Sequence, residues 1–259
     1  MADPRIPPVE DNLLSFMAAM VALPPLVREP WDDVHAAHSE IAFPLFNPVF
    51  GARFEPGSET RRTREVVAAY VARGLPFLWW ITPSTTSPEL EAVLTGAGLH
   101  REDIPGMHAV LEGPAARLLP RGVELTEVAV QDEVEPYLTT FFEGFGIPSE
   151  LHDAWAGMLL AFEAPGMVSV LATVDGLPAA TGTAWLTGST VGLYNITTLP
   201  HFRGRGVGHA VTTRLMDLGA ERGAAEAVLH ASDVGRPLYE RLGFVEVCQV
   251  PQYAWLPGS

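Results

Sequence analysis

The chain has 259 residues, of which 47% are apolar and 18% charged, and its formal net charge is −15 at pH 7. This length fits one large or two ordinary domains with an ample apolar core. The acidic balance argues against a nucleic-acid or anionic-membrane surface. No run of about 18 apolar residues occurs, so we expect no transmembrane helix.

The start of the chain and its single cysteine bear on where the protein works. The N-terminal stretch MADPRIPPVEDN lacks the basic region that opens a signal peptide. Cys248 excludes an intramolecular disulfide, which fits a reducing compartment. It stands in an apolar run that predicts a strand, where we expect a buried, inert thiol. We therefore expect a cytoplasmic protein.

Residues 11–46 are mostly apolar and include two histidines. A helix is expected to open at Asn12, and residues 32–41 are either helix or loop. His35 and His38 are three residues apart and would share one face of a helix. No third ligand with a recognisable spacing follows, so we predict structural or solvated histidines and no metal site.

The clearest helix of the first half is predicted over residues 59–74, since Ser58 can cap its start and Gly74 ends it. A Pro/Gly/Ala-rich stretch at 113–122 predicts the linker to the second half. The other elements expected before the linker are a buried strand or loop at 43–50, a strand at 77–82, a turn at 83–88, a short helix at 89–95 and a strand at 107–111.

Helices and strands alternate in the second half. Asp175-Gly176 is a strong hairpin signal between two apolar strands. Pro200 ends a strand rich in β-branched residues. The expected elements up to this point are strand 123–129, helix 132–145, helix 149–163, strands 168–174 and 179–186, and strand 191–199.

A glycine-rich turn follows this last strand and runs directly into an amphipathic helix. The first turn of a helix presents unpartnered amides and partial positive charge to an anion, and glycine lets that anion approach the backbone. Two arginines add charged donors. The turn matches neither the Walker loop nor the dinucleotide fingerprint. We predict a diphosphate cradle, with a plain turn as the alternative, formed by Arg203, Gly204, Arg205, Gly206, Val207 and Gly208.

Motifs in and around this turn carry a resemblance to a known family. Arg203, Gly206 and Gly208 fit the pattern Arg/Gln-x-x-Gly-x-Gly/Ala. Tyr239 begins Tyr-x-x-x-Gly-Phe, seven residues after Ser232. On these residues, and on a strand bulge expected at 197–200, the chain resembles the GNAT superfamily of N-acetyltransferases. The resemblance implies an α/β (α+β) fold with a mixed, mostly antiparallel central sheet flanked by helices.

The order of elements repeats within the chain. Residues 59–111 echo residues 206–256 in the succession of helix, apolar strand, turn, short helix, Gly-apolar pair and strand. The chain therefore resembles a tandem GNAT protein, with a degenerate N-terminal domain at 1–115 and a catalytic domain at 121–259. The first copy lacks the Arg-x-x-Gly-x-Gly motif, so we expect no cofactor site there.

The resemblance also implies acetyl-CoA as the acyl donor and a role for each motif. Backbone amides near Ile196 and Thr198, freed by a splayed or bulged strand, would bind the acyl carbonyl and pantetheine, and the glycine-rich turn would bind the diphosphate. Ser232, where the family often carries Asn, would bond the pantetheine arm, and Tyr239 would protonate the leaving thiolate. The cofactor-binding residues thus implied are Ile196, Thr197, Thr198, Leu199, Arg203, Gly204, Arg205, Gly206, Val207, Gly208, Ser232 and Tyr239.

The proton acceptor for the amine stays unassigned. Many members of the family place a glutamate on the fourth strand, where this chain has Gly192. Water can relay the proton instead. The other candidates are Tyr194 and Asn195, which are poor bases, His201 and His230, which we expect to be structural, and Glu143, His152 and Asp153, which would line an acceptor groove.

Two classes of function fit these residues. The first is an N-acetyltransferase in which an amine attacks acetyl-CoA directly, without an acyl-enzyme or a metal. Its acceptor would be a small molecule, an antibiotic-like amine or a protein amine. The tandem arrangement also resembles mycothiol synthases, which would imply a thiol-sugar amine. The second class is a non-catalytic acyl-CoA-binding sensor or assembly module. Either protein would be a monomer or a homodimer without nucleic-acid or membrane partners.

Overall fold

The computed structural model describes residues 3–114, 118–128, 131–152 and 164–258. The chain divides into two compact units. The larger unit comprises residues 3–13 and 107–247, and the smaller unit comprises residues 14–106 and 248–258. The chain passes between the units within α1 (Ile6–Met20), β5 (His100–Val110) and β11 (Val245–Trp255). The division into domains 1–115 and 121–259 stays a prediction.

The smaller unit packs two helices, α2 (Glu59–Arg73) and α3 (Pro88–Gly96), with a sheet in the order β1-β2-β3-β4-β11-β5. Strands β3 and β4 are parallel, and the pairs β1–β2, β2–β3 and β4–β11 are antiparallel. Its core is aromatic and aliphatic, with Tyr70, Phe77 and Trp79 fully buried. The strands first named here are β1 (Val27–Arg28), β2 (His35–His38), β3 (Pro48–Phe50) and β4 (Phe77–Trp80).

Two expectations for the first half are wrong. Helix α1 begins at Ile6, because the prolines that follow can occupy the first turn of a helix. Residues 35–38 form β2, so His35 and His38 lie on opposite faces of a strand and share no helical face. The ring of His35 stacks on Phe50 with centroids 5.2 Å apart, and His38 Nδ1 lies 2.7 Å from the carboxylate of Glu29.

The larger unit contains the sheet order β5-β10-β9-β8-β7-β6. Strands β6 to β9 pair antiparallel in succession, and β9 pairs parallel with β10. This is the mixed, mostly antiparallel sheet that the sequence predicts. The strands are β6 (Val123–Val128), β7 (Met167–Val174), β8 (Leu177–Thr187), β9 (Thr190–Thr198) and β10 (Glu226–His230).

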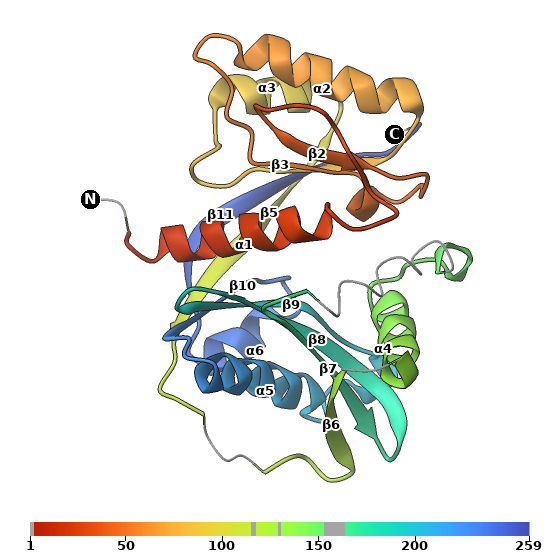
Figure 1. The fold of residues 1–259 in the computed structure, drawn as a ribbon, viewed down its shortest axis with the longest axis vertical. Coiled ribbons are helices and arrows are strands. Elements are labelled where there is room, and N and C mark those ends of the chain that lie inside the picture. Colours follow the sequence, from red (N-terminus) through yellow and green to blue (C-terminus); the bar gives the residue numbers. More distant parts are fainter. Residues whose placement is uncertain (1–2, 115–117, 129–130, 153–163, 259) are drawn as a thin grey trace. The chain divides into compact units, whose positions relative to one another are not determined.

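Helices cover both faces of this sheet (Figure 1). A β-carbon on Gly182 of β8 would lie 2.7 Å from Val211 and from Leu215 of α5 (Val207–Glu221). The next residue, Thr183, is hydrogen-bonded to Tyr137 of α4 (Gln131–Gly144). Because successive strand residues point to opposite faces, α5 and α4 lie on opposite sides of β8.

The turns of the larger unit follow the sequence closely. Asp175 and Gly176 have φ values of 51° and 81°, which is the left-handed pair expected of an Asp-Gly hairpin between β7 and β8. Short 3₁₀ turns occur at Ser149–Leu151 and Pro200–Phe202, and α6 spans Arg236–Arg241. The helix expected at 149–163 falls mostly on residues 153–163, outside the described residues.

Candidate functional site

Strand β9 carries a bulge. Thr183 of β8 pairs with Tyr194, whereas Thr181 pairs with Thr197, so two residues of β9 face the single residue Gly182. The extra pair is Asn195–Ile196, and Asn195 has a φ of 55°. We expected the bulge at residues 197–200. It lies instead at Asn195–Ile196, just before them. Asparagine tolerates this left-handed backbone better than threonine does.

The edge of β9 that faces β10 opens beyond the bulge. Parallel pairing with β10 covers Thr190–Leu193, although β9 continues to Thr198. The amide of Leu199 donates to the carbonyl of Ala179 over 2.9 Å. Since alternate residues of a strand address opposite edges, Thr198 directs its backbone groups away from β8. The amide of Thr198, expected to bind the acyl carbonyl, thus faces the opening. The amide of Leu199, another residue expected to bind the cofactor, does not.

The glycine-rich turn follows within the same unit and starts α5. Gly204 and Gly206 have φ values of 74° and 78°, which side chains disfavour. The amide of Ala210 donates to the carbonyl of Gly206, so the amides of the preceding first turn point out of the helix start. A β-carbon on Gly208 would lie 3.1 Å from Thr198 Oγ1, which brings α5 close to β9. Val207 is buried and offers only its amide.

Both arginines of the turn are exposed. Arg203 donates from Nε to the carbonyl of Thr198 over 2.9 Å, a bond that uses neither of its terminal amino groups. The guanidinium of Arg205 lies over the ring of Phe202, 5.6 Å from its centroid, and 3.7 Å from the carboxylate of Asp175. The two cations therefore flank the start of α5.

Tyr239 and Ser232 meet across Gly235. A β-carbon on Gly235 would lie 2.9 Å from the Tyr239 ring and 3.3 Å from Ser232 Oγ. The hydroxyl of Ser232 accepts the amide of Gly235 over 3.2 Å and so caps the chain ahead of α6. Tyr239 packs edge-on against Phe244. Its burial raises the pKa of the phenol to about 12, which keeps it protonated at neutral pH.

A residue that we had not predicted fills the place beside Gly192, where many members of the family carry a glutamate. Asn12, from the part of α1 that belongs to the larger unit, places Oδ1 where a β-carbon of Gly192 would stand. This oxygen accepts the hydroxyl of Tyr194 over 2.7 Å. Asn12 Nδ2 donates to the carbonyl of Trp185 and to Thr187 Oγ1. In the sequence, Asn12 is marked only as a polar residue within an apolar stretch that predicts a helix.

The other base candidates occupy different settings. The ring of His230 stacks with Tyr194 at 6.4 Å, and burial lowers the pKa of this imidazole to about 4. His201 is exposed beside Phe202, with ring centroids 4.2 Å apart. His152 stacks on Phe142 and lies 3.2 Å from the carbonyl of Ile147. Glu143 is exposed, and Asp153 lies outside the described residues.

The described residues contain no group of three His, Cys, Asp or Glu side chains that could hold a metal ion. In the same ranges, no helix is both long and apolar enough to cross a membrane. Cys248 is partly exposed, not buried as we expected, because β11 is only partly covered around this residue.

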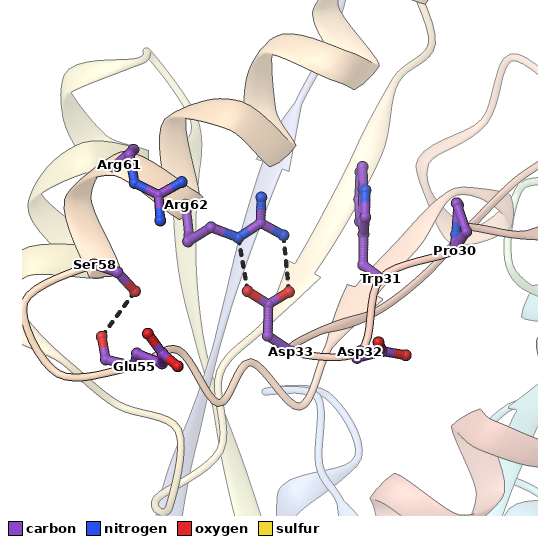
Figure 2. Close-up of a pocket in the computed structure, with 8 residues that line it drawn as sticks. All are labelled: Pro30, Trp31, Asp32, Asp33, Glu55, Ser58, Arg61 and Arg62. Carbon is purple, nitrogen blue, oxygen red and sulfur yellow. Dashed lines mark hydrogen bonds and ion pairs between the residues drawn. The ribbon is translucent and has the colours of Figure 1, made fainter.

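A pocket of about 490 Å³ lies at the start of α2 in the smaller unit, the counterpart of the start of α5 in the internal repeat. Figure 2 shows Arg62 forming two hydrogen bonds to Asp33, at 2.7 and 2.8 Å, and Ser58 bonded to the carbonyl of Glu55. Arg62 also pairs with Glu65. The pocket is lined by carboxylates as well as by Arg61 and Arg62, and the absence of a cofactor site in the first copy stays a prediction.

Comparisons with known proteins cover both units. Residues 129–244 match the model of the acetyltransferase (GNAT) family. A GCN5-related N-acetyltransferase from Kribbella flavida is 17% identical with a TM-score of 0.71, covering 97% of this chain and 96% of that one. One from Sphaerobacter thermophilus is 18% identical with a TM-score of 0.64, covering 86% and 76%. A comparison with curated protein sequences gave no match.

A third solved structure bears on the repeat. A tandem GNAT protein from the clavulanic acid biosynthesis pathway is 18% identical with a TM-score of 0.58, covering 87% of this chain and 79% of that one. The TM-scores of these three structures establish a shared fold despite the low sequence identities, and they confirm the fold class predicted from the sequence. The chain therefore has the GNAT fold, and its residues 129–244 match the model of the acetyltransferase (GNAT) family.

Proposed function

We propose that this protein is an N-acetyltransferase that moves an acetyl group from acetyl-CoA to an amine by direct attack. One observation carries the proposal: the open edge of β9 at Thr198 leads within ten residues to the first turn of α5. A ligand that carries a diphosphate and, at the end of an extended arm, a carbonyl matches two such sites on one stretch of chain. Acetyl-CoA is such a ligand.

The diphosphate would bind at the start of α5. Amides of the first turn and the positive end of the helix dipole favour an anion there. The terminal amino groups of Arg203 and the exposed guanidinium of Arg205 add charged donors. The net charge of −15 does not oppose this, since distant surface charges are screened beyond about 8 Å at physiological salt.

The acyl carbonyl would lie against the bulged part of β9. The amide of Thr198 addresses this edge, and we propose that it and the amide of Ile196 polarise the carbonyl and stabilise the oxyanion of the tetrahedral intermediate. The amine then attacks the carbonyl carbon, the C–S bond breaks, and coenzyme A leaves as a thiolate that gains a proton. No group on the protein is acylated.

Tyr239 would act on the leaving sulfur as the general acid. Its pKa of about 12 lies roughly three units above that of an ordinary thiol. The phenol therefore holds its proton and donates a hydrogen bond to sulfur while the C–S bond breaks. The phenol gives its proton to the departing thiolate, and the attacking amine loses a proton to water. Tyr239 then regains a proton through water, which returns the enzyme to its starting form.

A non-catalytic acyl-CoA sensor is the second candidate, and the contact between Asn12 and Gly192 favours it. Because Asn12 fills the space beside Gly192, this position of β9 holds no carboxylate to accept a proton from the amine. In the transferase reading a water takes that proton. The two functions bind the same ligand and differ only in turnover.

Isothermal titration with acetyl-CoA, followed by thiol release from the same sample across a panel of amines, tests both. Binding at one site per chain with amine-dependent release supports the transferase. Binding with no release from any amine supports the sensor. Two sites per chain would contradict the degenerate first copy, and a lack of binding would remove the proposed function altogether.

A further inference from the structure

The backbone bulge of β9 is held by side chains of the neighbouring strand. Thr181 and Thr183 lie on the same face of β8, on either side of Gly182. Thr181 Oγ1 donates to the backbone carbonyl of Asn195 over 2.9 Å. The amide group of the Asn195 side chain donates to Thr183 Oγ1 over 3.4 Å. Both ends of this left-handed residue are therefore tied to β8.

Thr183 is the centre of a buried network. Its hydroxyl lies 2.7 Å from Tyr137 Oη of α4 and 3.0 Å from Ser169 Oγ of β7, in addition to Asn195. A hydroxyl can donate once and accept twice, so these three neighbours use its full bonding capacity. Thr183 is 1% exposed and Thr181 is fully buried, which means that water cannot replace a partner that is removed.

The hydrogen bonds around Thr183 connect α4 to the edge of β9 that faces β10. A β-carbon on Gly144, the last residue of α4, would collide with the side chain of Thr197, so the end of this helix rests directly on the strand just beyond the bulge. The conformation of Asn195 sets the direction of the backbone that follows it. Through Thr198, that backbone presents the amide edge described above.

We propose that Thr183, together with Thr181, is a positioning residue for the acyl-binding edge of β9. The two hydroxyls hold Asn195–Ile196 in the bulged form and so aim the following amides at the acyl carbonyl. The inference rests on the proposed function, because an acyl carbonyl must bind there. Neither threonine touches the substrate, and loss of either hydroxyl lets the strand shift toward regular pairing.

The test uses Thr181→Val and Thr183→Val, which remove a hydroxyl and keep the branched shape, with Thr183→Ser to restore the hydroxyl. Thr213→Val is the matched control, because its buried hydroxyl donates to the carbonyls of His209 and Ala210 within α5. We expect each β8 variant to lower kcat about tenfold or more. We expect the Kd for coenzyme A without an acetyl group to change much less than kcat, because the diphosphate site is intact and only the contact of β9 with the pantetheine arm is affected.

Thr183→Ser should recover most of the lost kcat, and Thr213→Val should lose thermal stability without losing kcat. The inference is overturned if the β8 variants keep wild-type kcat, or if they weaken binding of coenzyme A as much as they slow turnover. A wild-type protein that binds acetyl-CoA without turnover would refute the transferase alone. In that case crystal structures of the two valine variants decide: a retained left-handed Asn195 overturns the inference, and a relaxed one supports it.

Discussion

The side-chain oxygen of Asn12 lies 1.8 Å from the position that a β-carbon would take on Gly192, too close for both atoms. The same oxygen accepts the hydroxyl of Tyr194, and burial raises the pKa of that phenol. Position 192 must therefore be glycine for α1 to lie where it does. The absence of a carboxylate at this point of β9 follows from packing, because any side chain there would displace Asn12.

A double-mutant cycle measures this relationship. Gly192→Ala should lower the free energy of unfolding by about 2–4 kcal/mol, since it forces Asn12 away from its buried partners. Asn12→Ala should cost about 2–3 kcal/mol by leaving those partners unsatisfied. In the Asn12→Ala background, Gly192→Ala should cost less, because the closest clash is removed, although the ring of Tyr194, 2.5 Å from the β-carbon, must still move.

Urea unfolding of the four proteins gives the coupling free energy. Gly96→Ala is a suitable control, since this glycine belongs to α3 and a β-carbon there would meet no neighbouring atom within 4 Å. It should be neutral or slightly stabilising. Additive effects of the Asn12 and Gly192 changes would show that the two residues are independent and would refute the packing argument.

Cofactor binding should depend on Gly208 and Arg203. Gly208→Val pushes a side chain against Thr198, since even a β-carbon would lie 3.1 Å from its hydroxyl, and so separates α5 from β9. Arg203→Ala removes a cation and the bond to the Thr198 carbonyl. We expect the Kd for acetyl-CoA to rise at least tenfold in each, about 1.4 kcal/mol, measured by isothermal titration.

Arg222→Ala serves as the control for Arg203→Ala, because it removes an exposed arginine at the opposite end of α5. Its affinity for acetyl-CoA should stay within twofold of wild type. If Arg222→Ala weakens binding as much as Arg203→Ala does, the effect reflects net charge and not a contact. Unchanged affinity in both Gly208→Val and Arg203→Ala would mean that the cradle lies elsewhere.

Tyr239→Phe should separate chemistry from binding. The ring and its packing against Phe244 remain, so the Kd for acetyl-CoA should change by less than about threefold. Loss of the hydrogen bond to the departing sulfur should lower kcat by about 10²-fold or more. Steady-state kinetics with the best amine of the panel supply the measurement, and an undiminished kcat would remove Tyr239 from the role of acid.

His230 should make stability depend on pH. Burial lowers its pKa in the folded protein to about 4, below the unfolded value of 6.5. The unfolded chain therefore binds more protons between these values, so stability is full above about pH 6.5 and falls as the pH drops toward 4. The loss amounts to roughly 3 kcal/mol for the whole interval at 1.36 kcal/mol per pKa unit.

Urea unfolding of wild type and His230→Gln between pH 4.5 and about 7.5 isolates this group, because other titrating residues are common to both proteins. The variant should lose part of the pH slope. His201→Gln, which changes an exposed histidine, should keep the wild-type slope. Equal slopes for wild type and His230→Gln would show that His230 is not buried as a neutral ring.

Much of the candidate site could be predicted because its signals are local. Three motifs fix the backbone conformation of only a few neighbouring residues, through backbone freedom and helix geometry. They are the glycines before α5, the Asp-Gly hairpin and the Tyr-x-x-x-Gly-Phe spacing. Periodicity located β9 and α5 for the same reason. The smaller unit was harder to predict, since β2 is a four-residue strand whose pattern also fits a helix or loop.

The sequence alone determined where the left-handed glycines and the start of α5 fall, because neither feature needs a distant partner. Only the tertiary structure decided the rest. The bulge lies at Asn195 because Thr181 and Thr183 of another strand bind it, Leu199 is excluded because Ala179 takes its amide, and Asn12 reaches Gly192 across about 180 residues of chain. Such contacts join residues that are distant in the sequence, so no local sequence pattern predicts them.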